Sequence, residues 1–174
     1  MNPKVLRITE TAVMTALLVA LQAVTRPAGQ LVTGSCVNAV LAVSALAVGV
    51  GSGLTVALLS PFFAFLLGIG PQLLPIVPSI AVGNLVFVAL LGLLAGGRDL
   101  PLWRSGGAVL AAAVCKFGAL YLLVVKVLCA VLPLKEPQIA AFTVMFSYPQ
   151  LITALAGGVI GLLLAPVLRR ALKR

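Results

Sequence analysis

The stretch that decides the fold is Gly106–Val131, which reads GGAVLAAAVCKFGALYLLVVKVLCAV. A helix that crosses a bilayer needs about 20 mainly apolar residues, and this stretch is longer, with Lys116 and Lys126 as its charged positions. Its apolar residues are continuous, whereas a strand of a membrane barrel alternates polar and apolar residues over about ten positions. A helix also bonds its own backbone groups inside lipid. The stretch therefore predicts a transmembrane helix.

Similar apolar segments make up most of the remaining chain, separated by short breaks rich in Gly and Pro. The full chain has 174 residues, of which 62% are hydrophobic and 9% charged, with a mean hydropathy of +1.24. Soluble domains carry about 25% charged residues. We therefore expect one all-α domain, residues 1–174, folded as a compact bundle of six transmembrane helices. The expected spans are Ile8–Val24, Gly34–Val50, Gly53–Gly68, Pro78–Gly96, Gly106–Val131 and Ser147–Leu168.

The Lys and Arg residues of the short loops predict the orientation of these spans. Cytoplasmic loops of membrane proteins carry an excess of Lys and Arg. With six spans, both termini lie on one side, and that side holds most of the basic residues. We therefore expect both termini in the cytoplasm. The basic residues on that side are Lys4, Arg7, Arg98, Arg104, Arg169, Arg170, Lys173 and Arg174, against Arg26 and Lys135 on the other.

Polar residues inside spans are costly, and in this chain they concentrate toward the outer side. At a rise of 1.5 Å per residue, Asn38, Asn84 and Gln150 lie about 6, 9 and 5 Å below the outer surface. Lys116 lies about 15 Å from the inner end of its span, near the midplane. The acidic residue inside a span, Glu10, lies two positions from the inner end of the first span and is not available at that depth. A lysine at this depth must meet backbone carbonyls, water or an anionic group of a ligand, and we favour the ligand. We expect a pocket that opens outward and binds an anionic or neutral substrate, with a carboxylate as the favoured group.

Some of these residues have a structural alternative. Asn38 and Asn84 could form hydrogen bonds between helices without a ligand, and Lys126 could reach the outer headgroups along its aliphatic stem. Tyr121 and Tyr148 lie near an interface, where aromatic residues commonly anchor a helix. They could also stack on a planar ligand, and we include both among the candidate substrate-binding residues.

The first span carries a small residue at every fourth position, at Ala12, Ala16 and Ala20. This spacing places a smooth surface on one face of the helix, along which another helix can approach closely. That second helix could belong to this chain or to a partner protein. For a similar set on the last span, which includes Gly157 and Gly161, we expect packing inside the bundle.

The motifs of the common catalytic and cofactor sites are missing. The sequence has no GxxxxGK[ST], HExxH or GxSxG motif and no histidine. Its three cysteines, at positions 36, 115 and 129, do not form a CxxC pair or a metal-ligand spacing. A soluble basic face for nucleic acid is also missing. We therefore expect a binding protein without a catalytic residue, a metal or a cofactor.

Taken together, the length, the six expected spans and the Ala12–Ala20 motif resemble the substrate-binding S component of energy-coupling factor (ECF) transporters. The segment Phe146–Thr153, FSYPQLIT, is also similar to sequences of that family. The resemblance implies high-affinity capture of a vitamin or another micronutrient in a prokaryotic cell membrane. It also implies that Ala12, Ala16 and Ala20 dock on a transmembrane T subunit, and that two partner ATPases drive import.

Two other functions remain open on the sequence alone. A stand-alone channel or small carrier would give flux in liposomes that contain only this chain. A membrane assembly factor would bind no small ligand. An S component differs from both, since it would capture a ligand but release it inward only with its partners.

Overall fold

The computed structural model describes residues 2–96 and 100–172, and this part of the chain is helical with short connecting turns. Three basic residues used to predict the orientation, Arg98, Lys173 and Arg174, lie outside the described residues. The α-helices are α1 (Pro3–Thr25), α2 (Gln30–Val43), α3 (Val50–Leu66), α4 (Ile76–Ala95), α5 (Leu102–Leu120), α6 (Cys129–Val131), α7 (Glu136–Met145) and α8 (Tyr148–Ala171). A 3₁₀ turn, η1 (Arg26–Ala28), and two π-helical segments, η2 (Ser44–Val48) and η3 (Tyr121–Leu128), continue some of them.

Long apolar helices dominate the described residues, in agreement with the predicted all-α membrane protein. Five continuous helical segments are long and apolar enough to cross a membrane, judged by length and composition. The apolar helix α3 has 17 residues and is shorter than these five. The five segments are Pro3–Ala28, Gln30–Val48, Ile76–Ala95, Leu102–Val131 and Glu136–Ala171.

The largest difference from the sequence prediction is α7, which lies in a stretch expected to be a loop. Pro137 falls in the break between the fifth and sixth expected spans and is typical of a loop, but it lies in the first turn of α7, where the missing N–H of proline costs nothing. The side chain of Gln138 accepts a hydrogen bond from the Lys135 backbone N–H at 3.0 Å and caps the turn. Phe142 and Met145 of α7 then pack near Phe146 in a small apolar cluster.

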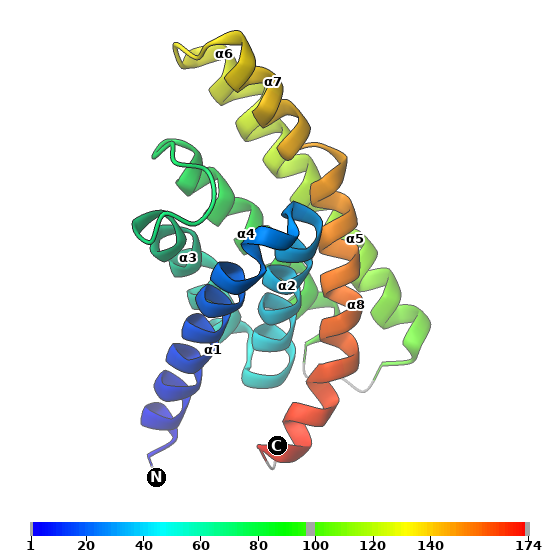
Figure 1. Ribbon diagram of the computed structural model, residues 1–174. Helices are drawn as coiled ribbons and strands as arrows, with labels where there is room; N and C mark the ends of the chain where they lie inside the picture. The colour runs from blue at the N-terminus through cyan, green and yellow to red at the C-terminus, as the bar shows by residue number, and fades with distance from the viewer. Residues whose placement is uncertain (1, 97–99, 173–174) are drawn as a thin grey trace.

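Helix α2 lies between α1 and α8 (Figure 1) and is buried from Asn38 to the end of η2. Glycines of α8 make this close packing possible. A Cβ atom on Gly157 would lie 2.5 Å from both Asn38 Cβ and the Ser35 carbonyl oxygen, and one on Gly161 would lie 2.3 Å from Ala42 Cβ. The structure thus confirms the predicted packing of these small residues inside the bundle. The close contact with Gly157 holds Asn38 in place.

The C-terminal end of the α2–η2 segment is fixed by a contact that the sequence did not indicate. In the π-helical segment η2, the Leu46 carbonyl oxygen accepts a hydrogen bond from Arg169 Nε of α8 at 2.7 Å. The segment ends at Gly49, whose φ of 137° suits a residue without a side chain. Arginine near a helix end commonly satisfies such carbonyls, so Arg169 ties α8 to α2.

The start of α1 and the end of α8 lie at the same end of the molecule, while α6, α7 and the α3–α4 connection lie toward the other end (Figure 1). The larger apolar cluster occupies the half nearer the termini and includes Leu41, Leu91 and Val109, which are almost fully buried. A smaller cluster around Leu120 and Phe146 lies in the other half. Lys116 of α5 lies between the two, about 21 Å along the helix from Leu102.

Candidate functional site

The centre of the candidate site is the amino group of Lys116, a residue that is only 2% exposed. Its Nζ donates to Asn38 Oδ1 at 2.6 Å and to Asn84 Oδ1 at 2.7 Å. These residues come from α5, α2 and α4, so three helices meet at one buried cation. The structure therefore brings together three of the residues that the sequence placed in the pocket.

Neighbouring groups fix the orientation of this cluster. The Asn38 Nδ2 donates to the Gly34 carbonyl oxygen at 2.8 Å and to Thr153 Oγ1 at 3.4 Å. With its nitrogen held in this way, the amide of Asn38 presents its oxygen to Lys116. The Lys116 Nζ also lies 5.5 Å from the centre of the Phe87 ring, within the range of a cation–π contact.

The two asparagine contacts suit a protonated Lys116. A lysine near the bilayer midplane costs at least about 2.5–3.5 kcal/mol on insertion scales, and a hydrogen bond to a charged group contributes roughly 1.5–3 kcal/mol. Two such bonds are large enough to offset the cost of burial. Asparagine is uncharged, however, so these two contacts would give a protonated Lys116 no counter-charge. An ammonium has three N–H donors, and the two amide oxygens occupy two of them.

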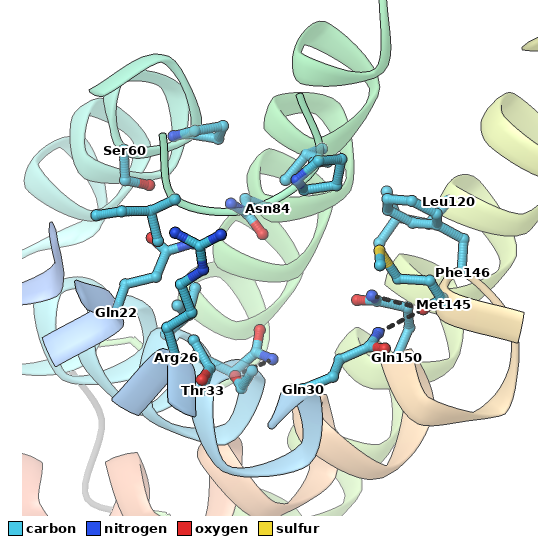
Figure 2. A pocket seen from close by; sticks show the side chains of 18 of the residues that line it. Gln22, Arg26, Gln30, Thr33, Ser60, Asn84, Leu120, Met145, Phe146 and Gln150 are labelled. Atoms are coloured by element: carbon cyan, nitrogen blue, oxygen red, sulfur yellow. Dashed lines mark hydrogen bonds between the residues drawn. The ribbon is translucent and has the colours of Figure 1, made fainter. Parts of the chain in front are cut away.

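Lys116, Asn38 and Asn84 line a cavity of about 360 Å³. Its outer part is formed by the chain around η1, by residues 69–71 of the α3–α4 connection and by the α7–α8 junction. Figure 2 shows Gln22, Arg26, Asn84 and Gln150 arranged around this space. Pockets for small ligands start at about 300 Å³, so the cavity suits a compact molecule.

Two hydroxyl groups in the cavity wall lack a hydrogen-bond partner. Ser60 Oγ and Thr33 Oγ1 are buried and make no hydrogen bond within the described structure. Other hydroxyls in these helices, such as those of Thr15 and Ser44, donate to the carbonyl oxygen four residues earlier. About 90% or more of buried polar groups are paired. Two unpaired hydroxyls beside one cavity fit a site whose ligand supplies the missing partners.

Arg26 adds a second cation at the outer part of the cavity. Its Nη1 donates to the Gly68 carbonyl oxygen at 2.8 Å, which links the end of α1 to the α3–α4 connection. Sequence reasoning counted Arg26 only as a loop charge and did not consider Ser60 or Thr33. For the two hydroxyl residues, the available signal was a polar side chain within an apolar stretch, which is weak because most such hydroxyls bond to their own helix.

The predicted tyrosines are not brought to this cavity. Tyr148 is 63% exposed, and neither Tyr148 nor Tyr121 is among the described residues that line the cavity. Tyr121 lies instead beside Phe117, with ring centres 6.0 Å apart, and beside Lys126, whose Nζ is 5.6 Å from its ring centre. The aromatic-anchor alternative fits these positions better. Gln150, by contrast, does line the cavity.

Ala12, Ala16 and Ala20 lie on the exposed face of α1. The face that packs into the bundle carries Met14 and Leu18 instead. The small-residue surface is thus left uncovered by the described part of this chain, and it is accessible to another helix.

Comparison of the chain with protein-family models, curated proteins and solved structures gave no match. Among the described residues, no group of three or more His, Cys, Asp or Glu side chains is close enough to hold a metal ion. Function is therefore inferred from the geometry around Lys116.

The Lys116 cluster makes a specific prediction for stability. Asn84→Leu leaves the buried ammonium with one amide partner and should lower the free energy of unfolding by about 2–4 kcal/mol. Lys116→Met removes the charge itself and should cost less. The double variant should therefore be more stable than Asn84→Leu alone, measured by denaturant unfolding in detergent. Simple additivity of the two single effects would show that Asn84 does not support the charge of Lys116.

Proposed function

We propose that this protein is the substrate-capture subunit, or S component, of an ECF-type importer of a small micronutrient. The observation that carries the proposal is the buried amino group of Lys116, which lines a cavity and, among the described residues, donates its hydrogen bonds to uncharged side chains. A receptor of this kind needs a pocket, a specific polar contact and a partner surface, and the chain offers a candidate for each.

The charges of the cavity favour an anionic ligand. Lys116 and Arg26 both line it, and the described lining residues include no Asp or Glu. A carboxylate can accept a hydrogen bond from the remaining N–H of Lys116, and charge-assisted bonds of this kind are about twice as strong as neutral ones. A cationic vitamin would meet repulsion at both positions. A small carboxylate is therefore the favoured substrate, with a neutral molecule as the next choice.

The packing below Lys116 favours capture over conduction. On the side of the termini, the chain continues into the apolar cluster that contains Leu41, Leu91 and Val109. Protein interiors of this kind are close-packed and leave few voids larger than a water molecule. A ligand that enters from the outer side would stop at Lys116 and would need a large rearrangement to pass. An S component receives the energy for that movement from its partners.

The proposal includes six spans with both termini in the cytoplasm of a prokaryotic cell. The 17 residues of α3 fall at the lower limit of about 17–25 residues for a spanning helix. The start of α1 and the end of α8 lie at the same end of the molecule (Figure 1), and the excess of Lys and Arg in the sequence on that side favours the cytoplasm. The cavity then faces outward.

The uncovered alanine face of α1 is the proposed docking surface for a T subunit. Ala12, Ala16 and Ala20 would let a partner helix approach closely, since small residues at every fourth position favour helix contacts in lipid. Two ATPases bound to the T subunit would supply the energy. This chain itself would need no catalytic residue and no cofactor.

Two alternatives make different predictions. A stand-alone channel or carrier would move its substrate in liposomes without a partner, and an assembly factor would bind no small molecule. The S-component proposal predicts binding without transport until the T subunit and the ATPases are added.

Native mass spectrometry of the purified protein tests the capture function directly. We expect a bound small carboxylate in the wild type and its loss from Lys116→Met, because that variant lacks the cation in the cavity. Lys126→Met is the matched control, since Lys126 does not line the cavity, and it should retain the ligand. A ligand that stays bound to Lys116→Met would contradict the assigned role of this lysine.

Ala16→Trp tests the docking surface. A large side chain at this position should prevent the close approach of a partner helix and abolish co-purification with a T subunit, while ligand binding stays unchanged. Leu163→Trp on α8 is the control, because Leu163 is also exposed but lies outside the alanine face. Loss of ligand binding in Ala16→Trp would indicate that this face supports the bundle itself.

A further inference from the structure

Gln30 and Gln150 share one hydrogen-bond acceptor at the outer part of the cavity. The Gln30 Nε2 donates to the Met145 carbonyl oxygen at 2.6 Å, and the Gln150 Nε2 donates to the same oxygen at 3.1 Å. Figure 2 shows both bonds as dashed lines that meet at Met145. Met145 is the last residue of α7, and the final carbonyls of a helix lack partners within it. The two glutamines therefore complete the end of α7.

This shared acceptor fixes the direction of both amides. A carbonyl oxygen can only accept hydrogen bonds, so each glutamine must turn its nitrogen toward Met145. The Oε1 atoms then lie at the other end of each amide, and neither has a hydrogen-bond partner among the described residues. Both glutamines line the cavity. The outer part of the site thus offers two acceptors, whereas its other end offers the remaining N–H donor of Lys116.

The charges of the cavity decide what kind of donor suits these oxygens. A protonated amine would lie in a cavity with Arg26 and Lys116 and with no acidic residue among its described lining. An uncharged N–H group avoids that repulsion and still satisfies the acceptors. Gln30 precedes Asn38 by eight positions in the same helical segment, so the two residues lie about 12 Å apart along the helix axis. A compact molecule can therefore meet both ends of the site.

We infer that the substrate is a small carboxylate whose opposite end carries an uncharged N–H donor, as in a carboxamide, ureido or lactam group. The carboxylate bonds to Lys116, and the N–H bonds to the Oε1 of Gln30 or Gln150. This inference rests on the proposed capture function and specifies the class of molecule captured.

A matched series of probes tests the inference on the intact protein in detergent. The first series consists of the monoamides of linear dicarboxylic acids, from succinamate to suberamate. The second consists of methyl ketones of the same shape, in which a methyl group replaces the NH₂. This series runs from levulinate, which matches succinamate, to the homologue that matches suberamate in length. Isothermal titration calorimetry gives the dissociation constant of each pair.

At the best chain length, the monoamide should bind roughly tenfold or more tightly than its ketone, because the ketone offers no N–H donor to the Oε1 atoms of Gln30 and Gln150. Gln30→Met/Gln150→Met should bind both compounds about equally. Gln72→Met is the control, since Gln72 does not line the cavity, and it should keep the preference. The wild-type comparison decides the question even if the double variant does not fold.

If the wild type bound both series equally and Lys116→Met bound neither, the inference would be overturned. The capture function would remain intact. Binding by no member of either series would also overturn the inference. The ligand found by native mass spectrometry would then decide the capture function separately.

Discussion

The cost of burying one positive charge in a membrane explains much of this structure. Lys116 is almost inaccessible to solvent and takes its partners from two other helices, through Asn38 and Asn84. Those two residues must therefore stay in register with α5. The close contact of Gly157 with Asn38 and the bond from Asn38 to Gly34 serve this requirement. Packing and polar chemistry thus meet at the same place in the bundle.

Much of the fold could be predicted because lipid imposes simple rules on the backbone. Continuous apolar segments had to be helices, and the positions of Lys116, Asn38, Asn84 and Gln150 indicated where polar groups would gather. The helix α7 was missed because Pro137 is compatible with both a loop and a first helical turn. Propensity alone does not distinguish the two, and the packing of α7 against neighbouring apolar residues decides between them.

The site was less predictable than the fold, since sequence gives depth along a helix but not the direction of a side chain. Tyr121 and Tyr148 have suitable depths, yet they lie outside the cavity, and Tyr148 is mostly exposed. Conversely, Ser60 and Arg26 line the cavity although their local sequence gives at most a weak signal of it. The contacts that place them are long-range, such as the bond from Arg26 to Gly68.

The central claim is that the ammonium of Lys116 is the group that binds the substrate. An experimental structure of the protein with its co-purified ligand tests this most directly. We predict an anionic oxygen of the ligand within about 3.2 Å of Lys116 Nζ, a normal hydrogen-bond distance, with the bonds to Asn38 and Asn84 retained. A ligand bound elsewhere, with Lys116 still held only by the two asparagines, would contradict the claim.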